Sequence, residues 1–392
     1  MVTTRTEPER TDPAHYTPFE TWVLEEGLTI TQQQVIPDLR TAELAPWDRT
    51  GVDATLLDMT PNLPSRSFLR QQSTSRYLCE IPPGGTYKAE RHLYEEVFYV
   101  VSGRGAISVW HEGCPKHTFE WQAGSVFSIP LNAWHELYNA SGEEPARLYA
   151  MFTAPMVFNI YGNREFIFNT NATFPERFDP DDETYFSGKA VRVRHRLMKT
   201  NFISNVRVLD LDDHGRRGPG TNMHAVLANG HMICHLSEFP GQTYKKAHTA
   251  DPSRTRAGLN SEVAYLFLDG EGYDLQWGLD VEPGPGVPFD RIDYREGSLL
   301  TPGPGYHQHF NATTDPIRYV VLRFGGLEGG VREDGGRREV EERAPQEVQG
   351  GRSPRQIEFE EEDPAVWDLF EAELAKRGLK PKMEEYRAAP RS

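Results

Sequence analysis

The sequence predicts an all-β protein made of two small barrels and one C-terminal helix. Short aliphatic and aromatic runs separated by Gly, Pro, Asn and Asp are typical of strands joined by tight turns. Such runs occupy residues 96–101, 124–129, 147–152, 264–268 and 318–324. Many short strands favour a sandwich or a barrel. The 392 residues, 38% of them hydrophobic, suffice for two cores of this kind.

An internal repeat assigns the strands to two copies of one barrel. Five features recur in the same order: Pro83-Gly84 as Pro240-Gly241, Gly103-x-Gly105 as Gly270-x-Gly272, Gly124-Ser125 as Gly297-Ser298, His135-x-x-x-Asn139 as His307-x-x-x-Asn311, and Arg147 as Arg318. The offset between the copies stays between 157 and 173 residues. Its drift indicates an insertion between Pro240 and Gly270.

The repeat divides the chain into five predicted segments. Barrels are expected at residues 70–155 and 225–325, after an N-terminal arm at residues 1–69. Residues 156–224 are too long for a plain loop, so we expect this connection to add strands to both barrels. Residues 326–392 are expected to form a linker rich in Gly, Arg and Glu, followed by a helix.

The C-terminal helix is predicted from its ends and its apolar face. Asp363 is a suitable N-cap, Pro364 suits the first turn, and Gly378 is suited to the end of the helix. Three apolar side chains then share one face: Trp367, Phe370 and Leu374. We expect this face to pack on a barrel or on a second subunit, and we expect a homodimer.

Composition excludes several classes of partner. The net charge of −16 disfavours nucleic acid and anionic membranes, because no basic field attracts phosphates. No apolar run approaches the roughly 20 residues of a membrane span, and the polar N-terminus lacks a secretory pattern, so a cytoplasmic protein is expected. Cys79, Cys114 and Cys234 are too few and too far apart for a disulfide framework.

The first repeat carries a cluster of His and Glu residues at regular spacing. Its first part reads Gly84, five residues, Glu90-x-His92, three residues, Glu96, six residues, Gly103. Its second part reads Gly124, five residues, Pro130-x-Asn132, two residues, His135, three residues, Asn139. Both spacings resemble the two motifs of the cupin superfamily. The departures are Glu90, where the family has His, and Asn132, where it has Gly.

The resemblance implies a fold and a set of metal ligands. The chain looks most like uncharacterised bacterial bicupins, with a distant likeness to bicupins such as gentisate dioxygenase and quercetinase. This implies two jelly-roll barrels, with Glu90, His92, Glu96 and His135 converging inside the first. Residues two apart on a strand share a face, so Glu90 and His92 are expected to project together.

Imidazole and carboxylate groups together suit Fe(II), Mn(II), Ni(II) or Zn(II). Two His and one carboxylate with open positions are typical of non-haem iron oxygenases, so Fe(II) is the first choice. Glu90 is either a further ligand or a catalytic base. The alternative is a metal-free relic of such a site, as in cupins that only bind ligands.

The second repeat is less regular. Counting from Gly241 puts Ala247 and Thr249 where the first barrel has ligands, which leaves His307 as the residue in register. A second metal site would have to combine His248, His307 and His309, with Glu262 if a bulge turns it inward. The alternative is a structural barrel that supports the first. The sequence therefore predicts that the first barrel is the metal site.

The predicted activity is a dioxygenase that acts on a small hydroxylated or carboxylated substrate, aromatic ones included. Tyr94, Phe98, Phe127 and Trp134 are candidates to line its pocket, although aromatic residues on strands also form cores. Two alternatives stay open: a metal-dependent isomerase, decarboxylase or lyase in which Glu90 transfers protons, and a non-catalytic ligand-binding bicupin.

Overall fold

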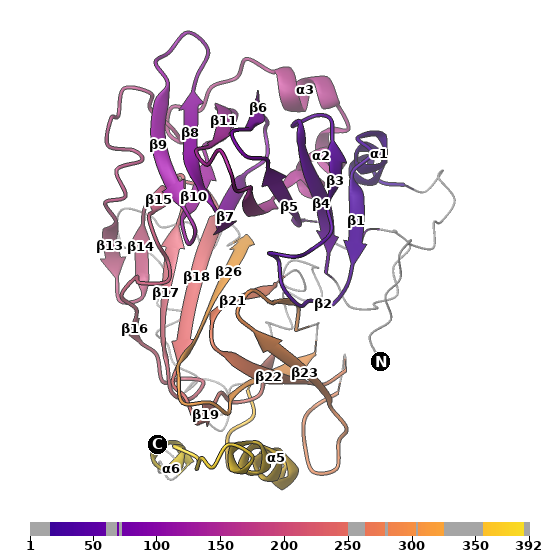
Figure 1. Ribbon diagram of the computed structural model, residues 1–392, viewed down its shortest axis with the longest axis vertical. Coiled ribbons are helices and arrows are strands. Elements are labelled where there is room, and N and C mark those ends of the chain that lie inside the picture. The colour runs from indigo at the N-terminus through magenta and orange to yellow at the C-terminus, as the bar shows by residue number, and fades with distance from the viewer. Residues whose placement is uncertain are drawn as a thin grey trace. The chain divides into compact units, whose positions relative to one another are not determined.

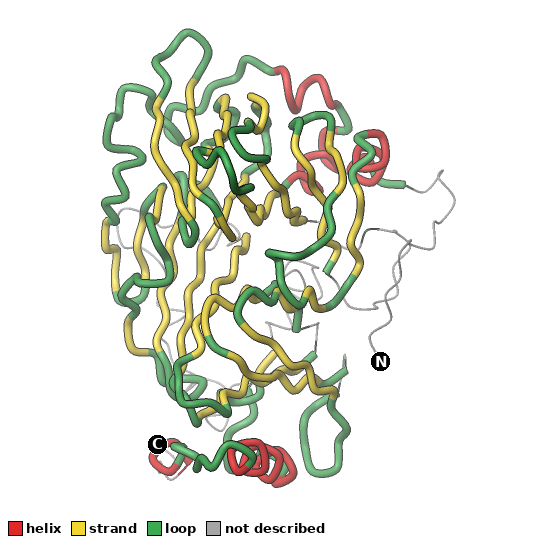
Figure 2. Tube along the Cα trace, in the orientation of Figure 1, coloured by secondary structure: helices red, strands yellow, loops and turns green. Residues whose placement is uncertain are grey.

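The computed structural model describes residues 16–59, 69, 73–249, 263–278, 281–302, 305–324 and 356–387. Strands make up most of their regular structure, as Figure 2 shows, and the all-β prediction is confirmed. The described residues fall into two compact units. The first unit contains the described residues of Met1–Leu209, His224–Cys234 and Leu322–Gly330, and the second unit contains the remaining described residues. None of the described helices is both long and apolar enough to cross a bilayer.

Two sheets form the barrel of the first unit (Figure 1). The larger has the order β1 (Thr29–Gln32), β4 (Val52–Asp58), β5 (Ser75–Ile81), β12 (Ala146–Phe152), β7 (Glu96–Ser102), β10 (Val126–Ile129) and β15 (Phe202–Ile203), with β3 (Ala45–Trp47) beside β4. The smaller has the order β6 (Thr86–Glu90), β11 (Trp134–Asn139), β8 (Arg104–Trp110) and β9 (His117–Gln122). The segment predicted as an arm thus supplies three strands to the larger sheet.

Three short helices cover part of this unit: α1 (Pro18–Glu25), α2 (Ala154–Tyr161) and α3 (Arg164–Asn169). Thr17 begins α1 with a capping box, because its side chain accepts from the Glu20 amide while Glu20 accepts from the Thr17 amide. The buried Trp22 of α1 stacks on Phe158 of α2 at 4.7 Å. This contact joins the N-terminal helix to the barrel core.

The connecting segment contributes short strands. Strands β13 (Val191–Arg194) and β14 (Leu197–Lys199) form a hairpin, and β14 runs parallel to the end of β17 (Thr221–Val226). Strand β16 (Asp212–Asp213) pairs with the start of β17. One further short strand, β2 (Val35–Ile36), lies in the N-terminal segment.

The second unit repeats the strand order of the first. In its larger sheet, β18 (Met232–Phe239), β26 (Ile317–Phe324), β21 (Tyr265–Asp269) and β24 (Leu299–Leu300) follow one another, as β5, β12, β7 and β10 do. Of β18 and β26, the larger part belongs to the second unit. In its smaller sheet, β19 (Thr243–Tyr244), β25 (Tyr306–Asn311), β22 (Glu271–Gln276) and β23 (Asp290–Arg295) follow the order of β6, β11, β8 and β9. Strand β20 (His248–Thr249) also pairs with β25.

The repeated residues have matching structural roles in the two units. Arg147 Nε lies 2.5 Å from Glu80 Oε2, and Arg318 Nε lies 2.7 Å from Glu238 Oε2. A Cβ atom at Gly105 would lie 1.9 Å from the carbonyl oxygen of the neighbouring strand, and one at Gly272 would lie 2.3 Å from its counterpart. Glycine is required at both positions because the strands approach closely there.

The C-terminal helix α5 (Pro364–Ala375) forms as predicted, and α6 (Glu384–Arg387) follows it. Asp363 accepts a hydrogen bond from the Ala365 amide at 2.9 Å and so caps the helix. Phe370 and Leu374 are fully buried in a cluster that includes Tyr244 and residues of β25. The apolar face is therefore covered within its own unit, so it gives no support to a second subunit. The homodimer stays a prediction.

Glu373 of α5 predicts a pH-dependent contribution to stability. Its carboxylate accepts from Arg291 at 2.7 Å and from Lys376 at 2.6 Å, and these hydrogen bonds lower the pKa of Glu373 to about 2. A carboxyl whose pKa is lower in the folded state than in the unfolded state stabilises the folded state. This contribution is fully present above the pKa of the unfolded state, near 4.5, and is lost as the pH falls towards the folded-state pKa of about 2. After allowance for solvent screening it amounts to about 1–2 kcal/mol.

We therefore expect Glu373→Gln to lower the free energy of unfolding by that amount at pH 7. The difference from the wild type should shrink below pH 4.5 and disappear near pH 2. Urea unfolding over this pH range measures it. The control is Glu371→Gln on the exposed side of the same helix, which should change little at any pH. A difference for Glu373→Gln that did not depend on pH would contradict the electrostatic explanation.

Candidate metal centre

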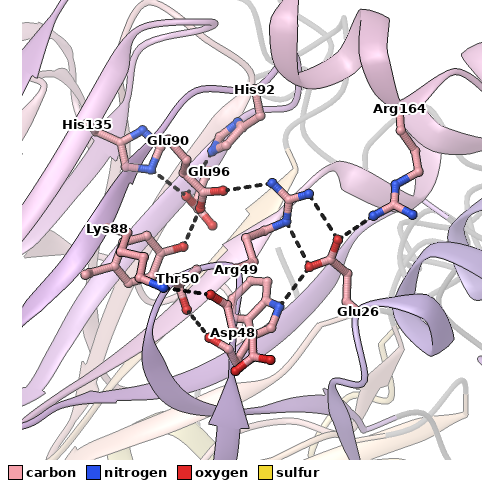
Figure 3. Close-up of polar contacts among 12 residues, drawn as sticks. Glu26, Asp48, Arg49, Thr50, Lys88, Glu90, His92, Glu96, His135 and Arg164 are labelled. Atoms are coloured by element: carbon pink, nitrogen blue, oxygen red, sulfur yellow. Dashed lines mark hydrogen bonds and ion pairs between the residues drawn. The ribbon is translucent and has the colours of Figure 1, made fainter.

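Four acidic and imidazole side chains converge inside the first barrel. Glu90 ends β6 and lies opposite His135 of β11 in the pairing register. Glu96 begins β7, and His92 lies in the loop after β6. All four are buried. Figure 3 shows their side chains pointing toward one another from these separate elements.

The route by which His92 reaches the cluster differs from the predicted one. Glu90 and His92 do not share a strand, because β6 ends at Glu90. His92 is instead held by its own loop, where Nδ1 donates to the Tyr94 carbonyl at 2.8 Å. Its ring also stacks on the Tyr94 ring with centroids 3.6 Å apart. These contacts direct Nε2 of His92 towards the cluster.

The distances suit a shared cation. One ligand atom each from Glu90, His92 and His135 can be chosen so that all lie within 4.8 Å of one another. Glu96 Oε2 is 3.3 Å from His92 Nε2 and 3.9 Å from His135 Nε2. Two carboxylates and two imidazoles are thus grouped as a ligand set for Fe(II), Mn(II) or Zn(II) would be.

The hydrogen bonding of the cluster also fits a metal ion. Glu90 Oε2 and His135 Nε2 are buried and lack a hydrogen-bond partner among the described residues, which is costly for polar atoms. Nδ1 of His92 carries the proton, so its Nε2 is an acceptor, and Glu96 can hydrogen-bond to it only as the protonated acid. A divalent cation would replace that proton and satisfy the unpaired atoms.

Burial dominates the electrostatics of these groups. It lowers the pKa of His92 and of His135 to about 4, so both imidazoles are neutral near pH 7 and can donate a lone pair. Burial raises the pKa of Glu96 to about 7, against the opposing effects of His135 and the Tyr77 hydroxyl. Burial likewise raises the pKa of Glu90.

Three neighbours of the cluster were not predicted from the sequence. Tyr77 donates to Glu96 Oε1 at 2.8 Å, and Tyr87 donates to Glu90 Oε1 at 2.5 Å. Arg49 places Nη1 3.7 Å from Glu90 Oε2, although it belongs to the segment predicted as an arm. No motif marks Arg49. Tyr87 lies three residues before Glu90 on β6. In the pairing with β11, Glu90 lies opposite His135 and Tyr87 opposite Leu137, and the register is irregular between these two pairs.

The predicted pocket residues occupy different environments. Tyr94 contacts His92, as described above. Phe98 and Phe127 are fully buried and pack on each other at 5.4 Å, as core residues do. Trp134 alternates with His135 along β11, so it faces the opposite side and stacks on Trp110 at 6.1 Å. Of these four aromatic residues, Tyr94 is the one that stacks on a candidate metal ligand of the first barrel, namely His92.

The second barrel also groups potential ligands. His248, His307 and His309 are buried and offer ligand atoms that all lie within 4.8 Å of one another. His248 lies opposite His307, as Glu90 lies opposite His135. Counting from Gly241 missed this register by one, because the chain breaks its pairing between β19 and β20. Glu262, the fourth predicted member, lies outside the described residues.

Comparison with known proteins agrees with this architecture. A model of the cupin domain matches residues 77–152. An uncharacterised protein of Streptomyces coelicolor is 34% identical over 88 residues, which are 22% of this chain and 77% of that protein. Auxin-binding protein 4 of Zea mays is 31% identical over 80 residues, 19% of this chain and 39% of that protein.

Among solved structures, oxalate decarboxylase of Bacillus subtilis aligns with a TM-score of 0.44 and 12% identity, over 75% of this chain and 76% of that one. The strand order of one unit recurs in the other, and the family model matches the first of them. The chain belongs to the cupin family and is a bicupin.

Proposed function

We propose that this bicupin is a metal-dependent dioxygenase whose first barrel binds Fe(II) and acts on a small hydroxylated or carboxylated substrate. The observation that carries the proposal is the pair of buried ligand atoms, Glu90 Oε2 and His135 Nε2, that lack a hydrogen-bond partner among the described residues and lie beside His92 and Glu96. A divalent cation bound there would supply Lewis-acid chemistry and, in the case of Fe(II), redox chemistry.

The surrounding residues prepare the ligands for this role. Tyr77 donates to Glu96 Oε1, which leaves Glu96 Oε2 3.3 Å from His92 Nε2, and Tyr87 donates to Glu90 Oε1. The Tyr94 carbonyl sets the proton of His92 on Nδ1, and the Ala133 carbonyl lies 3.4 Å from Nδ1 of His135. Neighbours of this kind orient the donor atoms and strengthen metal binding.

Arg49 is proposed to select an acidic substrate. Its Nε and Nη2 donate to Glu26 at 2.9 and 3.0 Å, as Figure 3 shows, while Nη1 faces the Glu90 carboxylate at 3.7 Å. The guanidinium also lies over the Phe168 ring at 3.9 Å. A cation held this rigidly beside the ligand cluster favours a substrate carboxylate or phenolate.

Arg49→Gln is therefore expected to raise KM for a carboxylated substrate by about 10- to 100-fold, the equivalent of one charged hydrogen bond, with a smaller change in kcat. Steady-state kinetics measure the two constants. The matched control is Arg164→Gln, an exposed arginine that donates to the same Glu26 at 2.6 Å, and it should leave KM unchanged. Equal effects of both variants would show that Arg49 only supports Glu26.

A metal-dependent decarboxylase, isomerase or lyase is the second candidate. It is favoured by Glu90, whose carboxyl is buried, accepts from Tyr87 and has a raised pKa, because these properties suit a group that transfers protons. In that case Glu90 would hold or release the proton, and dioxygen would not be consumed.

One experiment separates these functions. The purified protein is loaded with Fe(II) or Mn(II) and given a panel of phenols, hydroxy acids and dicarboxylic acids. Oxygen uptake in proportion to substrate loss supports the dioxygenase. Carbon dioxide release or rearrangement without oxygen uptake supports the second candidate. A loaded protein that binds panel members and converts none of them would contradict both and favour a ligand-binding bicupin.

A further inference from the structure

We propose that the interior of the second barrel holds a small carboxylate anion, bound by the buried Lys245 together with Tyr319 and His309. This goes beyond the proposed function, which uses the first barrel alone. The three residues belong to the second unit, and none of them is more than 6% exposed. The anion would therefore be enclosed by the barrel.

The site is a polar layer at a level of the barrel that is apolar in the first unit. Four residues lie at matching register positions: Ser237 at that of Cys79, Asp274 at that of Ile107, His309 at that of Leu137, and Tyr319 at that of Leu148. All of these side chains are buried. Polar groups inside a barrel cost free energy unless they are hydrogen-bonded, whereas apolar groups gain from burial. A bound polar ligand would account for the exchange.

Lys245 gives this layer a positive charge. Its backbone amide donates to the His309 carbonyl at 3.0 Å, which fixes its place in the layer. Nζ donates to the Ser237 hydroxyl at 2.8 Å and to the Tyr319 hydroxyl at 3.4 Å. Both partners are neutral, and no carboxylate of the described residues forms an ion pair with this ammonium.

The surroundings of Lys245 offset its charge only in part. The rings of Phe239 and Tyr319 lie 5.2 and 5.3 Å from Nζ, within reach of a cation–π attraction. Such contacts are worth less than the cost of removing an ammonium from water without an ion pair. An anion beside Nζ would supply the missing negative charge.

The one carboxyl of the layer does not neutralise Lys245. Asp274 Oδ1 lies 2.6 Å from Nδ1 of His309. Burial raises the pKa of Asp274 well above its usual range, against a weaker effect of the Gln276 side chain. Burial lowers the pKa of His309, and the positive charges of Lys245 and Arg217 lower it further. Both shifts favour the neutral form, so the net charge of the layer is positive.

The remaining donors match a carboxylate. A neutral Asp274 donates to Nδ1 of His309, which places the other ring proton on Nε2, and Nε2 has no partner within the described part of the chain. Tyr319 accepts from Lys245 and keeps its own proton to donate, and Nζ has a third N–H beyond its two hydroxyl partners. Two carboxylate oxygens can accept from these groups, and one negative charge balances one ammonium. A ligand inside the barrel must be small, so acetate is a suitable probe.

Equilibrium dialysis with radiolabelled acetate measures the binding. Arg49→Gln serves as the background chain, because Arg49 is proposed to bind carboxylates in the first barrel. We expect about one acetate per chain at saturation, since one ammonium is balanced by one anion, both before and after metal ions are removed with EDTA. Acetamide, a neutral molecule of similar size, should not compete.

Variants of the background chain assign the binding to Lys245. Adding Lys245→Met should weaken acetate binding by about 10- to 100-fold, the loss of one charged hydrogen bond, and adding Tyr319→Phe should weaken it by about 2- to 10-fold. The matched control is Lys246→Met, because this neighbouring lysine pairs with Glu358 at 2.5 Å, and it should leave binding unchanged.

Urea unfolding gives a second measurement. Acetate should raise the unfolding midpoint of the background chain, because it binds the folded state. Lys245→Met should remove this effect and raise the midpoint measured without acetate, since it replaces an unpaired buried charge by an apolar side chain.

Three results would overturn the proposal: no acetate binding by the folded background chain, equal binding after Lys245→Met, or binding that disappears with the metal ions. Should Lys245→Met fail to fold by circular dichroism, Tyr319→Phe and the comparison of acetate with acetamide decide the same question. An inactive first barrel would contradict the proposed function without affecting this result, because the background chain already lacks Arg49.

Discussion

Replacing His135 by alanine is expected to remove the divalent cation from the first barrel. His135 is fully buried, and its Nε2 has no hydrogen-bond partner among the described residues, so the proposed cation would satisfy this nitrogen. Loss of a direct ligand should weaken Fe(II) or Mn(II) binding by at least ~100-fold, more than the 10- to 100-fold typical of supporting residues. Fe(II) or Mn(II) per chain after dialysis measures this.

Two control variants accompany that measurement. His111→Ala removes a buried histidine outside both groups and should leave the Fe(II) content unchanged. His307→Ala removes the register counterpart of His135 in the second barrel and should also keep the Fe(II) or Mn(II) of the first. If His307→Ala lost this ion while His135→Ala kept it, the roles assigned to the two barrels would be reversed.

Replacing Phe370 by alanine is expected to lower the free energy of unfolding of the second unit by about 3–5 kcal/mol. Phe370 is fully buried and lies 5.0 Å from Tyr244 and 5.9 Å from Phe310 between ring centroids. Its removal would leave a cavity between α5 and the barrel, and the aromatic neighbours cannot collapse fully into it. Urea unfolding followed by tryptophan fluorescence measures the loss.

The matched control for Phe370 lies on the same helix. Asp368 is exposed, so Asp368→Ala should change the free energy of unfolding by less than about 0.5 kcal/mol. A loss of under 1 kcal/mol for Phe370→Ala would show that α5 does not contribute to the core of its unit. Circular dichroism of the variant before unfolding establishes that the helix itself remains.

The sequence motifs predict which residues form the first cluster, but they predict only in part which strand or loop positions each side chain. The spacing from Gly84 to Gly103 marked Glu90, His92 and Glu96, because it resembles the first motif of the cupin superfamily. It could not show that β6 ends at Glu90, or that the loop after it turns His92 inward. That turn depends on the contact of His92 with Tyr94 and on the backbone of Asn132, whose amide donates to the His92 carbonyl.

Residue spacing in the sequence predicts even less about Arg49 and about the histidine group of the second barrel. Arg49 lies 41 positions before Glu90 in the chain, and only the pairing of strands far apart in sequence brings them to 3.7 Å. In the second barrel, residue counting from Gly241 assumed a regular strand, whereas β19 and β20 are separate segments. One residue of slip in a strand reverses the face of every side chain, so the count placed Ala247 at the position that His248 occupies opposite His307.

The sequence alone determined the all-β class, the two-barrel repeat and the C-terminal helix, because turns, strand runs and helix caps are local features that recur at readable spacings. Tertiary structure decided which side chains meet. The partners Tyr77 and Tyr87 of the first cluster, and Asp274 behind His309 in the second, come from strands whose register depends on long-range pairing, and Arg49 comes from the turn between β3 and β4. Register is set by how whole sheets bury their faces, and residue spacing within one strand does not contain that information.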